Sequence, residues 1–485
     1  MKIVIAYPPL IDPRGVPLLS QNRQLEWCGD PTYIYPIVPA YAATLLQDAG
    51  YSPIWLDGIA SNQSYEDWLD NFRKADPDIV IMETKTPVIK KHWKIISDLK
   101  AQNPNLKTVL CGDHVTAMPE ESFKESEVDF VISGGDYDFL SLNLANHLSK
   151  NEALKPGIWF KSQNTIKSSG KFIADNDLNK LPFIDRELSQ WRLYSEKNGN
   201  FEKTPGTYIM SGRDCWHHQC TFCSWTTLYP KYRTRSPENV INEIGLLIKE
   251  HGVKEIMDDT GSFPIGTWLE TFCQLMQEKG YHKDVTLDCN MRFSALTSDQ
   301  YRMMKRSGFR LLLFGLESGN QQTLDRLKKN VKVEDIVSSC RKAKEAGLEP
   351  HITLMFGYPW ETREDAMKTL QIGSFLLKKG YADTVQATII IPYPGTPLFK
   401  EAKDQGWLNT LDWDRYGMDE LVLNSSVDKE EVAQIIEKIY KIGFNPEFLI
   451  RKIIRIRNFS DIKYMARAGK KLLGHIRDYS KKSQT

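Results

Sequence analysis

The chain has 485 residues, 41% of them hydrophobic, which is enough apolar material for roughly two or three cores and too much for one small domain. Its formal net charge is +1, and this balance argues against a protein that coats nucleic acid. Eight cysteines are spread over the length, and the sequence has neither a signal peptide nor an apolar run of about 18 residues. We therefore expect a cytoplasmic protein with reduced thiols and no membrane-spanning segment.

Residues 1–150 alternate short apolar runs, such as 3–6 and 79–82, with amphipathic stretches, such as 38–49 and 88–102. This alternation predicts parallel strands covered by helices, a doubly wound sheet in which ligands bind beyond the carboxyl ends of the strands. The turns predicted at those ends are Tyr7-Pro8-Pro9, Glu83-Thr84-Lys85, Cys111-Gly112-Asp113-His114 and Ser133-Gly134-Gly135.

Residues 151–205 are polar, with a weak strand signal, and are predicted to form a linker between domains. In residues 206–400 six strand-and-helix units recur. Their strands are predicted at 207–210, 255–257, 286–289, 310–315, 349–355 and 384–391. Six units are fewer than a closed eightfold barrel needs, so we predict a partial (β/α)6 TIM barrel, an α/β fold. Residues 401–485 are expected to form a helical C-terminal region with a basic tail.

Three cysteines, Cys215, Cys220 and Cys223, lie directly after the first of these strands. Thiolates are the ligands of iron–sulfur clusters, and a cubane with three local ligands leaves one iron open to a substrate or cofactor. A zinc site with His217 or His218 as fourth ligand is an alternative, as are three unrelated buried cysteines. The spacing alone leaves all three interpretations open.

The cysteine segment resembles the motif of the radical S-adenosylmethionine superfamily, Cys-x3-Cys-x2-Cys, in which an aromatic residue, here Phe222, precedes the last cysteine. It departs from that motif because four residues separate Cys215 from Cys220, which leaves the roles of His217 and His218 open. Five later segments resemble family segments at successive strand ends. They are Asp258-Asp259-Thr260, Cys289-Asn290-Met291-Arg292, Phe314-Gly315-Leu316-Glu317-Ser318-Gly319, Met355-Phe356-Gly357-Tyr358-Pro359-Trp360-Glu361-Thr362 and Pro392-Tyr393-Pro394-Gly395-Thr396-Pro397.

This resemblance implies that the three cysteines hold a [4Fe–4S] cluster whose open iron binds S-adenosylmethionine. One electron, from a donor such as ferredoxin or flavodoxin, then cleaves the cofactor and yields a 5′-deoxyadenosyl radical. The implied contacts to the cofactor are Phe222 beside the adenine, Asp258, Asp259, Glu317 and Ser318 toward the methionine and ribose ends, and Gly357 at the nucleoside.

The N-terminal region resembles the cobalamin-binding domain of one branch of this superfamily. The implied contacts are Tyr7, Pro8, Gly112, His114, Ser133 and Gly134. The Asp-x-His-x-x-Gly signature that supplies a histidine to cobalt is absent, so we expect no protein histidine on the metal. A vestigial or purely structural domain is the alternative.

The resemblance as a whole implies a cobalamin-dependent radical enzyme, with methyl transfer to an unactivated centre of a hydrophobic substrate, a small molecule or lipid-like compound. A cobalamin-associated cyclase, ring-contraction or oxidation enzyme is one alternative, and a non-enzymatic zinc-binding protein is another. From Arg451 onward the chain has eleven Lys or Arg against two Asp or Glu. This tail is predicted either to pack on the barrel as a solvated helix or to rest on an anionic membrane surface as a peripheral contact.

Overall fold

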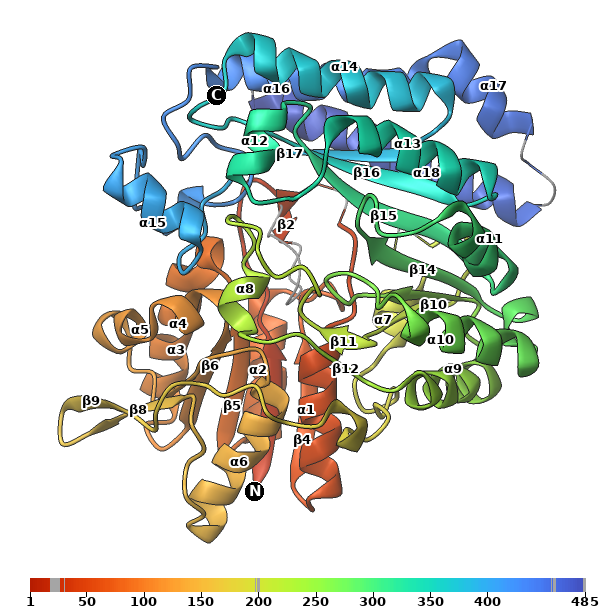
Figure 1. Cartoon of the computed structure of the whole chain (residues 1–485). Helices are drawn as coiled ribbons and strands as arrows, with labels where there is room; N and C mark the ends of the chain where they lie inside the picture. Colours follow the sequence, from red (N-terminus) through yellow and green to blue (C-terminus); the bar gives the residue numbers. More distant parts are fainter. Residues whose placement is uncertain are drawn as a thin grey trace.

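The structure is a computed structural model that describes residues 1–17, 27–29, 31–196, 198, 201–454, 456 and 459–482. Two large parallel sheets dominate it, one in each half of the chain, and both predicted sheets are confirmed (Figure 1). In the view of Figure 1 the N-terminal sheet lies below the second sheet, and the C-terminal helices lie along the top. Among the described residues, no helix combines the length and the apolar character that crossing a membrane requires.

The first sheet has seven strands in the order β4-β1-β5-β6-β7-β8-β9. Its first five strands are parallel, and β8 and β9 are antiparallel, so the predicted linker 151–205 also extends this sheet. The strands are β1 (Lys2–Tyr7), β4 (Ser52–Asp57), β5 (Ile79–Thr84), β6 (Lys107–Gly112), β7 (Phe130–Ile132), β8 (Ile158–Ser162) and β9 (Thr165–Ser168). The helices between them are α1 (Ile37–Asp48), α2 (Tyr65–Ala75), α3 (Ile89–Gln102), α4 (Asp113–Ala117), α5 (Pro119–Glu125) and α6 (Tyr137–Lys150).

The second sheet has six parallel strands in the order β10-β13-β14-β15-β16-β17, which is the partial barrel predicted from the sequence. The strands are β10 (Gly206–Ile209), β13 (Glu255–Asp258), β14 (Thr286–Met291), β15 (Phe309–Glu317), β16 (Glu349–Phe356) and β17 (Thr384–Ile389). The helices are α9 (Pro237–His251), α10 (Thr267–Glu278), α11 (Ser298–Arg306), α12 (Gln321–Arg326), α13 (Val333–Glu345) and α14 (Arg363–Lys379).

Local sequence signals explain where these helices begin and end. Helix α14 begins at Thr362, whose side chain forms a reciprocal capping box with Asp365, and it ends at Gly380 in the left-handed conformation. Helix α9 begins in the same way with a cap from Ser236 and ends at the left-handed Gly252. Each strand end is therefore followed by a well-defined helix, which fixes the loops that carry the site.

The C-terminal region comprises α15 (Pro397–Asp404), α16 (Lys429–Lys441), α17 (Pro446–Ile454) and α18 (Phe459–Lys482). Helix α18 packs against α16, and Arg467 donates to the backbone carbonyl of Phe201 at 3.0 Å. Arg451 donates to the carbonyl of Leu377 at 2.8 Å. These cations bond to the protein, as expected for helices packed on the barrel. Residues 455, 457, 458 and 483–485 of the basic tail lie outside the described residues.

Candidate functional site

A cavity of about 560 Å³ lies between the cysteine loop, the inner face of the second sheet and the C-terminal helices. All three predicted cluster ligands line it. The cavity also reaches Cys28, Thr32 and Ile34 of the N-terminal domain. A volume of this size is typical of small-molecule and cofactor sites, and here it joins the two domains.

The cysteine loop runs from β11 (Gly212–Arg213) to α8 (Trp225–Leu228). Burial raises the pKa of Cys215 and Cys223, so these thiols must lose protons when they bind a metal. Among the described residues, no three Cys, His, Asp or Glu side chains are grouped for one metal ion. A cubane does not require such convergence, because each thiolate binds a different iron. The trio on one cavity wall therefore fits a cluster better than it fits zinc.

The two histidines of the loop have different surroundings. His217 bonds through Nε2 to the carbonyl oxygen of Lys328 at 2.7 Å, which directs its ring toward the α12 end. His218 forms an ion pair with Asp214 and lines the cavity, with its backbone in the left-handed region. Of the two histidines, His218 lines the cavity that the three cysteines also line.

Arg292, the residue after β14, lies beside Cys220 of the cysteine loop. Its guanidinium lies 3.9 Å from Cys220 Sγ and 5.4 Å from the centre of the Trp216 ring, and it donates to the carbonyl of Lys329. A buried cation at this distance stabilises the more negative, reduced state of a cluster.

We therefore expect Arg292→Leu to make the reduction potential of the reconstituted cluster more negative by on the order of 60 mV, which is about 1.4 kcal/mol for one electron. A redox titration followed by electron paramagnetic resonance measures the shift. The matched control is Arg302→Leu, since Arg302 lies on the exposed face of α11. A potential that does not move in Arg292→Leu would contradict the role given to this cation.

Three of the predicted S-adenosylmethionine contacts, Phe222, Asp259 and Glu317, line the cavity. Glu317 lies at the end of β15 with a φ of 64° and pairs with the buried Lys329, Nζ to Oε1, at 2.7 Å. Lys329 Nζ also lies 5.9 Å from the centre of the Phe222 ring. These residues form one polar wall beside the cysteine trio, and Lys329 is a member that the sequence did not single out.

The other three predicted contacts, Asp258, Ser318 and Gly357, do not line this cavity. Asp258 accepts from the backbone N–H groups of Ser211 and Thr260, both at 3.0 Å, and burial raises its pKa to about 6. Ser318 donates to Glu361 Oε1 at 2.6 Å. In this structure the side chains of Asp258 and Ser318 bond to residues behind the cavity wall, and the contact of all three residues with the cofactor stays a prediction.

The predicted cobalamin contacts lie at the carboxyl edge of the first sheet, where the topology requires them. Tyr7 lines a small cavity with Asp57 and Tyr194, and its hydroxyl donates to Glu83 Oε2 at 2.6 Å. His114 is buried and bonds through both ring nitrogens, to Thr86 at 3.1 Å and to Glu121 at 2.9 Å. A histidine held in this way is not presented to a metal, in keeping with the expectation that no histidine ligates cobalt.

Pro8, Gly112, Ser133 and Gly134 line neither of these two cavities. The Gly134 Cβ position would lie 2.2 Å from the Phe172 ring, and that of Gly135 would lie 1.9 Å from the Tyr229 ring. Gly135 also donates to the carbonyl of Leu228 at 2.9 Å. Glycine is therefore required in this turn because Phe172 of the linker and Tyr229 of the second domain pack against it, and the contact of Gly134 with cobalamin stays a prediction.

Asp57, at the end of β4, makes stability in this region depend on pH. Burial raises its pKa to about 6, and hydrogen bonds from Tyr194 and Ala60 only partly offset the effect. The folded state therefore binds this proton more tightly than the unfolded chain. The stabilising contribution is fully present below about pH 4 and is lost as pH rises through about 6.

We expect Asp57→Asn to gain roughly 3 kcal/mol of unfolding free energy relative to the native chain between pH 4 and pH 7. Urea unfolding of the full chain across that range measures the difference. Asp70→Asn, on the exposed face of α2, serves as the control, and its unfolding free energy should depend on pH in the same way as that of the native chain. If the unfolding free energy of Asp57→Asn depended on pH in the same way as that of the native chain, the raised pKa of Asp57 would be refuted.

Comparison with known proteins agrees with this geometry. Residues 31–140 match the family model of the B12 binding domain, and residues 209–372 match that of the radical SAM superfamily. The chain is 27% identical to the uncharacterised methyltransferase PH0819 of Pyrococcus horikoshii, over 95% of this chain and 96% of the relative. It is 25% identical to the anaerobic magnesium-protoporphyrin IX monomethyl ester cyclase of Cereibacter sphaeroides, over 79% of this chain and 62% of the cyclase.

Among solved structures, the radical S-adenosylmethionine methyltransferase TsrM from Kitasatospora setae, with cobalamin and a [4Fe–4S] cluster bound, superposes with a TM-score of 0.67. The superposition covers 98% of this chain and 99% of TsrM at 15% identity, so it shows a common fold. The two sheets and the helical C-terminal region are thus one architecture shared along nearly the whole length of both chains.

The chain thus carries a radical S-adenosylmethionine domain, preceded by a B12-binding domain. Its cofactors are accordingly a [4Fe–4S] cluster, S-adenosylmethionine and cobalamin. The zinc interpretation of the cysteine trio is thereby set aside.

Proposed function

We propose that the protein is a cobalamin-dependent methyltransferase that modifies an unactivated centre of a small-molecule or lipid-like substrate. When bound, the cluster and S-adenosylmethionine supply a radical that abstracts hydrogen, and cobalamin supplies the methyl group. The observation that carries the proposal is the cavity that joins the cysteine trio and the half-barrel interior to Cys28, Thr32 and Ile34 of the N-terminal domain. The methyltransferase PH0819, aligned over nearly the whole chain, supports it.

Different residues around the cavity would hold the cluster and present polar groups beside it. Cys215, Cys220 and Cys223 would hold the cluster, and the paired Lys329 and Glu317 present polar groups beside it. Deeper in the cavity the wall becomes apolar, which keeps water away from a reactive carbon radical. The substrate is thereby enclosed between the sheet and the helices instead of lying in an open groove.

A cyclase is the second candidate, because the magnesium-protoporphyrin cyclase relative aligns over 79% of this chain. The products distinguish the two. Methyl transfer consumes S-adenosylmethionine both as methyl donor and as radical source, so S-adenosylhomocysteine and 5′-deoxyadenosine must both form. A cyclase forms 5′-deoxyadenosine without S-adenosylhomocysteine.

The test uses the full chain reconstituted anaerobically with iron, sulfide and cobalamin, with reduced flavodoxin or ferredoxin as the proposed electron donor. We expect S-adenosylhomocysteine to form only when cobalamin is present, at about one cobalamin per chain. Formation of 5′-deoxyadenosine with no S-adenosylhomocysteine would exclude methyl transfer and favour the cyclase.

We further propose a peripheral membrane contact through α17, which exposes Leu449, Ile450, Ile453 and Ile454. Arg451 and Lys452 lie between these apolar residues in the sequence. They are half-buried and contact Leu377 and Asp383, and their positive charge adds attraction to an anionic surface. Co-sedimentation with phosphatidylglycerol vesicles is expected and should be lost in Ile450→Asp/Ile453→Asp. Equal sedimentation with phosphatidylcholine vesicles, or of the double variant, would contradict the contact.

A further inference from the structure

Residues 327–332 connect α12 to α13 and lie against the cysteine loop, and we call them the covering segment. Three successive carbonyls of this segment accept hydrogen bonds from the side on which the cluster ligands lie. The carbonyl of Leu327 accepts from the backbone N–H of Thr221 at 3.0 Å. The carbonyl of Lys328 accepts from His217 Nε2 at 2.7 Å. The covering segment is therefore bonded directly to the loop that carries the three cysteines.

The third carbonyl connects the covering segment to a cluster ligand. Lys329 accepts through its carbonyl from Arg292, and another nitrogen of the same guanidinium lies 3.9 Å from Cys220 Sγ. Lys328 and Asn330, on either side of Lys329, both have a φ of 52°, in the left-handed region that lysine adopts only at a cost. One guanidinium thus separates the covering segment from a cysteine of the trio.

The covering segment is positively charged, with three lysines and no carboxylate. Lys329 is buried and pairs with Glu317, so its charge is compensated inside the protein. Lys328 and Lys332 are exposed, and in the part of the chain that the structure describes neither has a carboxylate partner within 4.0 Å. Two positive charges are therefore open to a partner next to the cysteine loop.

The surface that adjoins the covering segment has the residue types that protein interfaces favour. The guanidinium of Arg326 lies 4.3 Å from the centre of the Trp360 ring and 4.8 Å from that of Trp407, and it pairs with Glu401. Both tryptophans are half-buried, and they pack against the same apolar cluster as Cys220. Tryptophan and arginine are enriched at the centres of interfaces. This surface is therefore packed through to a ligand of the iron–sulfur cluster.

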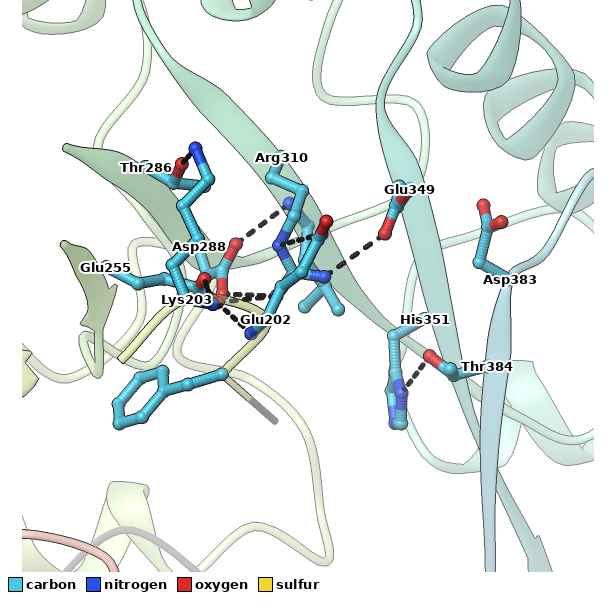
Figure 2. Close-up of polar contacts among 12 residues, drawn as sticks. Glu202, Lys203, Glu255, Thr286, Asp288, Arg310, Glu349, His351, Asp383 and Thr384 are labelled. Carbon is cyan, nitrogen blue, oxygen red and sulfur yellow. Dashed lines mark hydrogen bonds and ion pairs between the residues drawn. The ribbon is translucent and has the colours of Figure 1, made fainter. Parts of the chain in front are cut away.

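The opposite end of the barrel offers no comparable surface. There the buried Arg310 donates to Asp288 at 2.7 Å, to Glu255 at 2.8 Å and to Glu349 at 3.1 Å, as Figure 2 shows, so its charge is compensated within the protein. On β15, Arg310 also lies seven residues before Glu317, about 23 Å along the strand from the end that faces the cluster. An electron delivered there would have to travel the length of the barrel.

We propose that the covering segment, with the adjoining Arg326, Trp360 and Trp407, is the docking surface for an acidic one-electron carrier protein. Ferredoxins and flavodoxins are carriers of this kind. The carrier passes one electron to the [4Fe–4S] cluster, so the carrier is oxidised by one electron and the cluster is reduced by one. Electron-transfer encounters are small and transient, and complementary charge acts mainly on their association rate. The inference rests on the proposed function, and it adds the place where the electron donor binds.

The test follows reduction of the cluster, which requires neither substrate nor methyl transfer. Reduced flavodoxin is mixed anaerobically with the reconstituted full chain at low ionic strength, and stopped-flow spectrophotometry records its one-electron oxidation. Lys328→Glu/Lys332→Glu should lower the second-order rate constant at least about tenfold, and the loss should shrink as salt screens the charges. Reduction by photoreduced 5-deazariboflavin, a small uncharged reductant, should keep the native rate in this variant.

Lys167→Glu/Lys171→Glu is the matched control, because both lysines are exposed near β9 of the other domain and the net charge changes equally. Its rate constant with flavodoxin should stay close to the native value. A milder variant, Lys328→Asn/Lys332→Gln, removes the two charges without reversing them, and asparagine tolerates the left-handed backbone. It should show a smaller loss that salt also reduces. The iron and sulfide content of each variant verifies that the cluster has formed.

Three results would overturn the proposal. They are a native rate constant with flavodoxin in both variants of the covering segment, an equal loss in the control, and an equal loss with 5-deazariboflavin. A native chain that 5-deazariboflavin reduces and flavodoxin does not would overturn it as well. If the variants of the covering segment behave as expected but the native chain forms no S-adenosylhomocysteine, the methyltransferase assignment alone is refuted.

Discussion

Replacing Cys215, Cys220 or Cys223 with alanine is expected to abolish cleavage of S-adenosylmethionine, whichever of the three is changed. The loss should be complete because the loop offers three thiolates to the cluster, and each binds its own iron. Iron and sulfide content after anaerobic reconstitution, together with the yield of 5′-deoxyadenosine, measures the effect.

Two cysteines of the same barrel provide the control. Cys273 on α10 and Cys340 on α13 are fully buried in the hydrophobic core, away from the cavity. Their alanine variants lose some packing and should retain both cluster and cleavage. A trio variant with native iron content and native cleavage would show that another residue ligates the cluster.

Replacing Arg213 with glutamine is expected to lower the free energy of unfolding by about 3–5 kcal/mol, because it leaves the buried Asp138 without a cation and Asp136 with Arg233 alone. Arg213 is buried, donates to Asp136 at 2.7 Å, and pairs with Asp138. Burial alone would raise the pKa of Asp136, but Arg213 and Arg233 lower it to about 2. This cluster joins the first domain to the hairpin that leads into the cysteine loop, so calorimetry should record a lower melting temperature for the full chain.

The matched control is Arg302→Gln, which breaks an exposed pair with Asp299 and should change stability by less than about 1 kcal/mol. Adding Asp138→Asn to Arg213→Gln removes the carboxylate that has lost its cation and should recover part of the loss. Equal stabilities of Arg213→Gln and Arg302→Gln would show that the interdomain cluster contributes little.

Much of this architecture is readable from the sequence because each half repeats a simple alternation. All six barrel strands begin within one residue of their predicted positions, whereas β14 and β15 run two residues further than predicted and β17 ends two residues earlier. Parallel strands buried on both faces form continuous apolar runs, and β5, in which every residue is buried, is an example. The cysteine trio was found for a different reason, its unusual residue type and spacing.

What the sequence could not supply depends on contacts between distant segments. Thr32 and Ile34 line the cavity only because the two domains dock, and Lys329 joins the site only because it pairs with Glu317. Gly134 was predicted as a cobalamin contact from its motif, but the packing of Phe172 against it and of Tyr229 against Gly135 could not be predicted. Motif position predicted which loops matter, but it did not separate side chains on the cavity from those that brace its wall.

The wall that α18 contributes has a consequence for how the enzyme is made. Tyr464, Met465, Ala468 and Gly469 of this helix line the cavity, yet they are translated after every barrel strand. Because domains of a nascent chain fold from the N-terminus onward, the half-barrel forms while its helical side is still open. The cysteine loop is thus complete in the nascent chain before the helix that forms this wall of its cavity is made.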